Sequence, residues 1–209
     1  MSAVMQSLTV LDLSYCKRLV EIHPSIGQFS RLRYLKLYGC SNLTDLPCMS
    51  AVMQSLTVLD LSQCRKISLF PKFTGIMKSL SELDLSRTAI EKVEPSSIEC
   101  LTALAFLDLS VCRNLECLPS NMDNLKSLER LDLSHCWKLK SLPRLPSTVR
   151  FVGAGSSLKW SPKGVKLRIW SQPLSRWLPY DESGSRVRFT ILFHFLEVIS
   201  SRFLSLLNS

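Results

Sequence analysis

The sequence predicts an α/β solenoid in which short repeats stack side by side, with a parallel β-sheet on the concave face and short helical or irregular segments on the convex face. Three observations predict it. Leucine recurs in columns with a step of 24 residues, each unit has room for one short strand, and a proline-containing return segment follows each strand. Twenty-four residues cannot bury their own apolar side, so the units are expected to stack and share a core.

The strands are predicted from leucines that fill three columns without exception. The columns are Leu8, Leu32, Leu56, Leu80, Leu104, Leu128; Leu11, Leu35, Leu59, Leu83, Leu107, Leu131; and Leu13, Leu37, Leu61, Leu85, Leu109, Leu133. Side chains two residues apart, such as Leu107 and Leu109, point to the same face of an extended strand. Each unit therefore contributes one short strand, and neighbouring strands pair in parallel.

The return segments are predicted to hold only a turn or a short helix. Each has a proline near its start: Pro24, Pro47, Pro71, Pro95, Pro119 and Pro143. Proline lacks the N–H that a sheet or a helix interior needs, so it interrupts regular pairing. A further apolar column follows these prolines and is expected in the core: Phe29, Met53, Met77, Leu101 and Leu125.

Five of the eight cysteines lie on the same 24-residue ladder: Cys16, Cys40, Cys64, Cys112 and Cys136, with Thr88 on the missing rung. A small side chain with a weak donor can satisfy a carbonyl of the turn after the strand, which explains the exchange of cysteine for threonine. Neighbouring ladder cysteines, about 5 Å apart at Cα, would cross-link in an oxidising compartment. A reducing compartment, the cytoplasm, therefore fits better.

The amino-acid sequences of the units resemble the repeats of one known family. LDLSRTAIEKVEPSSI (Leu83–Ile98), LDLSVCRNLECLP (Leu107–Pro119) and LDLSHCWKLKSLP (Leu131–Pro143) resemble the leucine-rich repeats of plant intracellular immune receptors of the TIR, nucleotide-binding, leucine-rich-repeat class. The resemblance implies a non-catalytic recognition and regulatory module of a disease resistance protein in the cytoplasm, or in cytoplasm and nucleus. Its implied partners are a pathogen effector or host protein and the upstream domains of the parent receptor.

Two regions are predicted. Residues 1–158 form the leucine-rich-repeat solenoid, with six repeats and a degenerate last one that includes Val149, Val152 and Ala154. Residues 159–209 form a basic, apolar extension that holds eight basic and three acidic side chains, +5 of the net charge of +9. Alternation predicts two strands there, near Val165–Ile169 and Arg186–Ile191, whereas Ile191–Leu207 fits helix and strand equally.

A fragment of a receptor is the leading expectation for the whole chain. Met1–Ser14 recurs letter for letter as Met49–Ser62, a repeat begins within the first eight residues without a polar cap, and no phosphate loop G-x-x-x-x-G-K-[ST] is present. A general leucine-rich-repeat scaffold or adaptor outside immunity, and a truncated gene product without function, are the alternatives. An upstream phosphate loop in the parent transcript would separate the first two.

Enzymatic chemistry is not expected. Cysteine, histidine and aspartate recur at framework positions of the repeats, whereas a catalytic triad is a single site whose residues do not recur in every unit. The cysteine spacing lacks paired metal-ligand signatures, so we expect no metal and no cofactor. The basic side chains are scattered singly, so nucleic acid is not an expected partner. The longest apolar stretch is interrupted by His194, Glu197 and Arg202, so no transmembrane segment is expected.

The residues between and after the core leucines form columns that we expect on the concave face. One column is Val10, Tyr34, Val58, Glu82, Phe106 and Arg130, and another is Tyr15, Gly39, Gln63, Arg87, Val111 and His135. They vary while the leucines do not, which is typical of a binding face, although solvent exposure alone also permits variation. The predicted protein-binding residues are Tyr15, Tyr34, Lys36, Tyr38, Gln63, Glu82, Arg87, Phe106, Arg130 and His135.

Two features of that face carry specific expectations. Tyr15, Tyr34 and Tyr38 are expected to cluster as interface anchors, or else to shield the underfilled first repeats. The aspartates of the repeated LDLS motif are expected to form a framework stripe, relieved locally by Lys36 and paired with Arg87 and Arg130: Asp12, Asp60, Asp84, Asp108 and Asp132.

Overall fold

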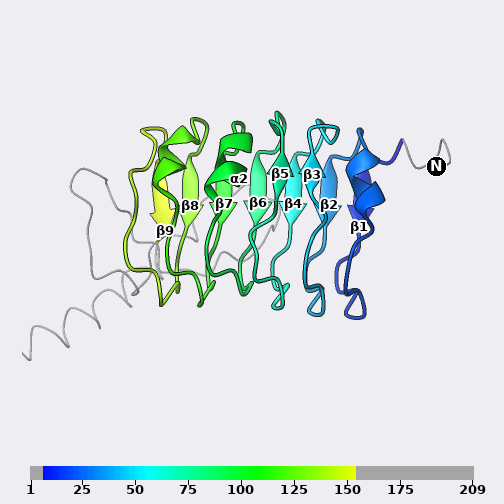
Figure 1. Ribbon diagram of the computed structural model, residues 1–209, viewed down its shortest axis with the longest axis horizontal. Helices are drawn as coiled ribbons and strands as arrows, with labels where there is room; N and C mark the ends of the chain where they lie inside the picture. Colours follow the sequence, from blue (N-terminus) through cyan, green and yellow to red (C-terminus); the bar gives the residue numbers. More distant parts are fainter. Residues whose placement is uncertain (1–6, 154–209) are drawn as a thin grey trace, which may run out of the picture. The chain divides into compact units, whose positions relative to one another are not determined.

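The computed structural model describes residues 7–153 and forms a stack of parallel strands (Figure 1). The chain divides into two compact units, Met1–Arg168 and Ile169–Ser209, and the second lies wholly outside the described residues. The expectations for Ala154 and for residues 159–209 therefore fall outside them too. The large sheet has seven strands in the order β1-β2-β4-β6-β7-β8-β9: Val10–Asp12, Tyr34–Lys36, Val58–Asp60, Glu82–Asp84, Phe106–Asp108, Arg130–Asp132 and Phe151–Gly153.

The register of the sheet follows the leucine columns. Leu11 pairs with Leu35, Leu35 with Leu59, and each later strand continues the same column, all in parallel. The last pair joins Leu131 to Val152, a step of 21 residues in place of 24. The predicted leucine-rich-repeat solenoid is confirmed, and each unit contributes one short strand to the large sheet.

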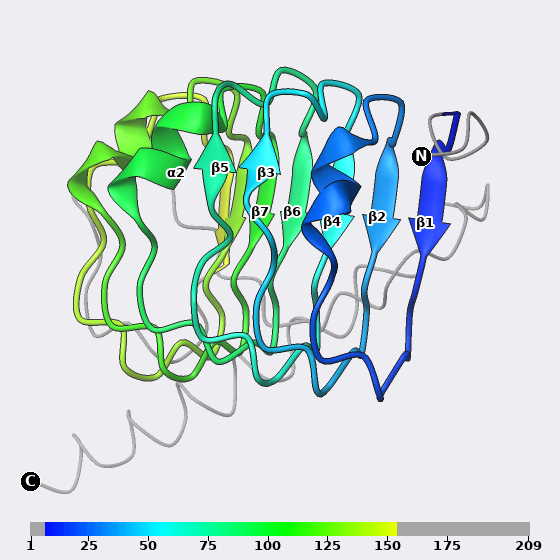
Figure 2. The same cartoon turned by 45° about the vertical axis from the view of Figure 1, so that its right-hand side comes forward.

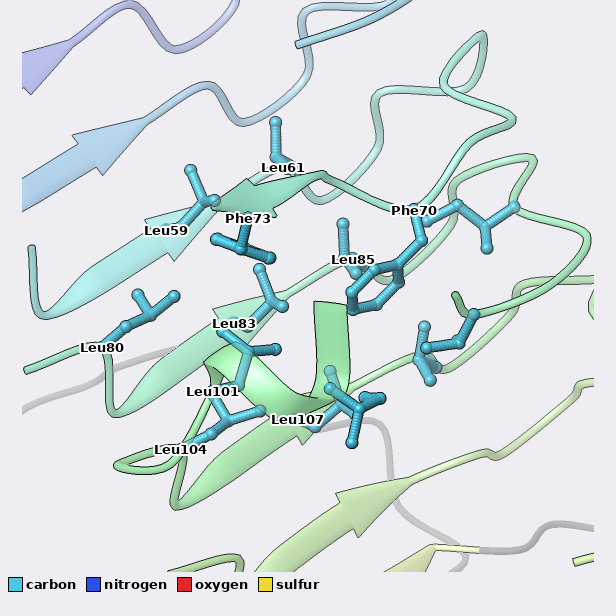
Figure 3. Close-up of a cluster of buried hydrophobic side chains, with 14 of the residues drawn as sticks. Leu59, Leu61, Phe70, Phe73, Leu80, Leu83, Leu85, Leu101, Leu104 and Leu107 are labelled. Atoms are coloured by element: carbon cyan, nitrogen blue, oxygen red, sulfur yellow. The ribbon is translucent and has the colours of Figure 1, made fainter. Parts of the chain in front are cut away.

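The core lies between the strands and the return segments. Figure 3 shows Leu59, Leu83 and Leu107, from three successive strands, pointing into it. All fifteen column leucines from Leu32 to Leu133 are at most 1% exposed, and the later apolar column from Phe29 to Leu125 is also buried. Leu8, Leu11 and Leu13 are only partly buried, because their strand is at the edge of the described stack.

Three return segments contain the predicted short helices. Two are 3-10 helices, η1 (Pro24–Gln28) and η2 (Ser120–Asn124), and one is an α-helix, α2 (Pro95–Cys100). Prolines 24 and 95 begin their helices, where the missing N–H costs nothing.

The restriction of return segments to turns and helices is wrong for two repeats. Strands β3 (Met49–Ser50) and β5 (Phe73–Thr74) pair in parallel and form a second sheet. Figure 2 shows their arrows running opposite to those of the large sheet. Pro47 and Pro71 precede the pair by two residues, so the N–H groups that pairing needs are available: Met49 N donates to Lys72 O at 2.8 Å and Ala51 N to Thr74 O at 2.9 Å.

The column of Tyr15 and its equivalents lies in turns and not in strands, contrary to expectation. Every member has a positive φ between 60° and 70°: Tyr15, Gly39, Gln63, Arg87, Val111 and His135. The backbone N–H groups of the first five donate to a carbonyl of the next repeat, as Arg87 N does to Ser110 O at 2.8 Å. The stack therefore imposes a left-handed turn after each strand, which only glycine adopts without strain.

Candidate protein-binding surface

The ten predicted binding residues all retain access to solvent. Six are exposed and four are half-buried: Tyr15, Tyr34, Lys36, Arg87, Arg130 and His135, then Tyr38, Gln63, Glu82 and Phe106. The register places Tyr34, Glu82, Phe106 and Arg130 in one column across the large sheet. The leucines between them point into the core, so alternation of the strand turns this column outward.

The column ends in a stacked group of three side chains. Phe106, Arg130 and Phe151 occupy paired positions on β7, β8 and β9. The Arg130 guanidinium carbon lies 5.6 Å from the ring centroid of Phe106 and 5.5 Å from that of Phe151. Both distances are within the range of cation–π attraction. A long, flexible side chain is thus held by two rigid neighbours.

Two of the three expected tyrosines form a cluster. The rings of Tyr15 and Tyr38 meet edge to face with centroids 4.7 Å apart, and Gln63 Nε2 donates to the Tyr38 hydroxyl at 2.9 Å. Gly39 makes room for this contact, because a β-carbon there would lie 3.0 Å from Cδ1 of Tyr15. Tyr34, 40% exposed, lies in the strand column apart from the turn positions, and no ring contact joins it to this pair among residues 7–153.

The aspartate stripe serves the framework, as expected. In five repeats the aspartate Oδ1 accepts the backbone N–H of the serine two residues later: Asp12 to Ser14, Asp60 to Ser62, Asp84 to Ser86, Asp108 to Ser110 and Asp132 to Ser134, at 2.7 to 3.0 Å. These bonds hold the start of the left-handed turn.

The expected pairing of Arg87 and Arg130 with the stripe is wrong. Between residues 7 and 153 the structure places no ion pair from either arginine to an aspartate, and the Arg130 guanidinium lies over phenyl rings. Lys36 does relieve the negative charge of the stripe locally, as predicted, through its effect on Asp12. Hydrogen bonds from Ser14, followed by the charge of Lys36, hold the pKa of Asp12 below its ordinary value.

Two carboxyl groups on this face have raised pKa values. Burial, followed by the charges of Asp84 and Asp132, raises the pKa of Asp108 to about 7, although hydrogen bonds from Ser110 oppose the shift. Desolvation, with a smaller contribution from Asp84, raises the pKa of Glu82. Asp108, in the middle of the stripe, is therefore partly protonated at neutral pH.

The cysteine ladder is structural, but its acceptor differs from expectation. The thiols of Cys40, Cys64, Cys112 and Cys136 each donate to the carbonyl 27 residues earlier, in the preceding repeat, at 3.1 to 3.2 Å. Thr88, by contrast, bonds its own turn, with Oγ1 2.7 Å from Leu85 O. Parallel stacking in phase places each thiol beneath the turn of its neighbour. All eight cysteines are free.

Two residues of this surface escaped sequence reasoning. Phe151 belongs to the strand column, but the last step of 21 residues hides it from a 24-residue register. Trp137, 57% exposed, follows the turn after β8 and its ring centroid lies 5.7 Å from that of His135. The sequence did contain a signal for Trp137, because it is the one aromatic residue at a position that is otherwise charged or small. The equivalent residues in the other five units are Lys17, Ser41, Arg65, Ala89 and Arg113.

Within residues 7–153, no three histidine, cysteine or acidic side chains are grouped to hold a metal ion. In the same residues, no helix has the length and apolar character to cross a bilayer.

Comparisons with known proteins agree with the fold. Models for the leucine-rich repeat match residues 54–113 and residues 7–29. No curated protein matches the sequence. The structure is similar to the leucine-rich repeat domain of the type III effector XopL, with 24% identity over 67% of this chain and a TM-score of 0.52. That match spans 58% of the XopL domain chain, less than two thirds of its length.

A second solved structure, a leucine-rich-repeat protein of Leptospira interrogans, aligns with 19% identity over 66% of this chain and 55% of its own, with a TM-score of 0.29. The described residues have the fold of a leucine-rich-repeat solenoid.

Proposed function

We propose that the outward face of the seven-stranded sheet binds a protein ligand, without catalysis by this chain. One observation carries the proposal: the side chains that vary along the repeats are the accessible ones, while the leucines beside them are buried. Aromatic and arginine side chains, which dominate binding energy at protein interfaces, recur on this face as Tyr15, Tyr34, Phe106 and Arg130.

At the finer level, we propose a recognition and regulatory module of a plant disease resistance receptor. The support is the wording of the repeats, such as LDLSHCWKLKSLP, which resembles receptors of the TIR, nucleotide-binding, leucine-rich-repeat class. The ligand would be a pathogen effector or a host protein, the upstream receptor domains would be further partners, and the location would be cytoplasmic or nucleo-cytoplasmic.

A scaffold or adaptor outside immunity is the second candidate. The similar solved domain belongs to a type III effector, so this fold alone does not select an immune receptor. A phosphate loop encoded upstream in the parent transcript would favour the receptor, and its absence there would favour the scaffold. The third candidate, a truncated product without function, predicts a chain that fails to melt cooperatively.

Ligand capture with variants of one face tests the proposal. The full chain, a face variant with Tyr34→Ala and Phe106→Ala, and a control variant with Leu69→Ala and Ile76→Ala would each carry the same affinity tag. Leu69 and Ile76 are both 50% exposed and belong to return segments. Captured proteins would be identified by mass spectrometry and their affinities measured with purified components.

We expect the full chain and the control variant to retain the same ligand and the face variant to lose at least about tenfold in affinity. Circular dichroism should show that Tyr34→Ala leaves the fold and melting temperature unchanged within error. A ligand bound equally by the face variant, or lost only with the control variant, would contradict the proposed surface.

A further inference from the structure

The side chain of Arg130 is held in place by its two neighbours in the strand column. It is exposed on β8, and its guanidinium lies between the ring of Phe106 on β7 and that of Phe151 on β9. Stacking on two aromatic faces restricts the arginine rotamers before any ligand arrives. Less conformational entropy is then lost when a ligand binds.

The N–H donors of this guanidinium have no hydrogen-bond acceptor among residues 7–153. The nearby acids are used elsewhere or lie further along the sheet. Asp132 Oδ1 accepts the Ser134 N–H at 2.8 Å and packs on Gly153, where a β-carbon would lie 2.5 Å from that oxygen. Glu82, the one acidic member of the strand column, is separated from Arg130 by Phe106.

We propose that Arg130, held between Phe106 and Phe151, is a carboxylate-binding site for an aspartate or glutamate side chain of the protein ligand. The planar guanidinium presents paired N–H groups that match a carboxylate in a bidentate geometry. The two phenyl rings place apolar surface beside the pair, which lowers the local dielectric and strengthens the attraction. This inference rests on the proposed function and names the chemistry that one part of the face recognises.

An acidic peptide can test this site without knowledge of the natural ligand. The full chain, labelled with ¹⁵N at arginine Nε, would be titrated at low ionic strength with a hexaglutamate peptide, and with hexaglutamine as the uncharged control. Arg130→Lys removes one resonance and so assigns it. We expect the Arg130 signal to shift saturably with hexaglutamate and to stay still with hexaglutamine.

Matched variants separate the stacked arginine from general positive charge. Phe106→Leu with Phe151→Leu keeps apolar walls but removes the aromatic faces, and should weaken binding by about threefold. Arg144 is also an exposed arginine, in the return segment after β8 and outside the predicted binding columns. Arg144→Lys should leave the titration unchanged.

Equal shifts at Arg144 and Arg130, or an unchanged affinity in the double leucine variant, would overturn the proposal. The natural ligand distinguishes this failure from failure of the proposed function. If Arg130→Gln binds that ligand as well as the full chain does, while the Tyr34 and Phe106 face variant does not, the face is correct and the carboxylate site is wrong.

Discussion

Asp108 accepts the backbone N–H of Ser110 at 2.7 Å while its side chain is buried between the positions of Asp84 and Asp132. The bond requires an oxygen acceptor, and a protonated or an ionised carboxyl group can supply it. Burial and the two neighbouring charges favour the protonated form, which is why the pKa of Asp108 rises to about 7. The hydrogen bond to Ser110 therefore holds the turn whether Asp108 is protonated or ionised, but the free energy of unfolding differs between the two forms.

The first prediction concerns pH. The unfolded chain releases the Asp108 proton near pH 4 and the folded protein near pH 7, so the folded state binds more protons between these values. The contribution of this group to stability is fully present below pH 4 and is lost as the pH rises through about 7. The free energy of unfolding should fall by at most about 1.4 kcal/mol per pH unit in that window.

Urea denaturation from pH 4 to 8 measures this dependence. Asp108→Asn retains an oxygen acceptor for Ser110 and should flatten the profile. Profiles of equal slope for the Asp108 variant and the natural protein would contradict the assignment.

The second prediction uses the repeated segment as an internal control. Leu13 and Leu61 lie in identical stretches of fourteen residues, yet Leu61 is fully buried and Leu13 only partly. Leu61→Ala should cost about 2 to 5 kcal/mol of stability. Leu13→Ala removes less buried area and should cost about 1 to 2 kcal/mol. Equal losses in denaturant titrations would show that the first repeat is as well packed as the third.

The third prediction concerns the exception in the cysteine ladder. The Thr88 hydroxyl donates to Leu85 O at 2.7 Å and lies 3.3 Å from the thiol of Cys112. Thr88→Val keeps the shape but removes the donor, and should destabilise the protein by about 1 to 2 kcal/mol. Thr88→Cys restores the residue of the other five rungs and should cost less. A valine variant as stable as the natural protein in thermal denaturation would refute a role for this hydroxyl.

The fourth prediction tests strain in the turns. Val111 is β-branched and has a φ of 61°, whereas Gly39 has the equivalent position with a φ of 70°. Val111→Gly should stabilise the protein by about 1 kcal/mol, because glycine adopts this conformation without steric cost. Gly39→Ala should destabilise it by a similar amount, since the added carbon would also crowd the Tyr15 ring. Opposite signs in calorimetry are the expected result, and changes of the same sign would contradict the strain.

Much of the candidate surface follows from the repeat. Once Leu35 and Leu59 are placed in register, Tyr34 and Val58 must be neighbours on the other face, because side chains alternate along a strand. The same reasoning fails where the period changes. Phe151 enters the column after a shortened unit, so the aromatic pair around Arg130 could not be derived from a 24-residue step.

The contact partners of the polar side chains could not be predicted from residue type alone. The sequence places Arg130 near aspartates and phenylalanines alike, and only the structure shows that the guanidinium lies on the rings. Likewise, a cysteine can donate to its own turn or to the one before it. The way the repeats stack places the acceptor in the preceding repeat, as in the hydrogen bond that the Cys64 thiol donates to Leu37 O.

The sequence by itself determined that each unit gives one strand to the large sheet, the parallel register of these strands and the buried leucines, because these follow from a fixed period and the need to cover apolar side chains. Tertiary structure alone decided the burial of Asp108, the left-handed turn at Val111, the pairing of β3 with β5 and the stacking of Arg130. Each of these depends on distances between adjacent repeats, and a pattern along one chain does not specify them.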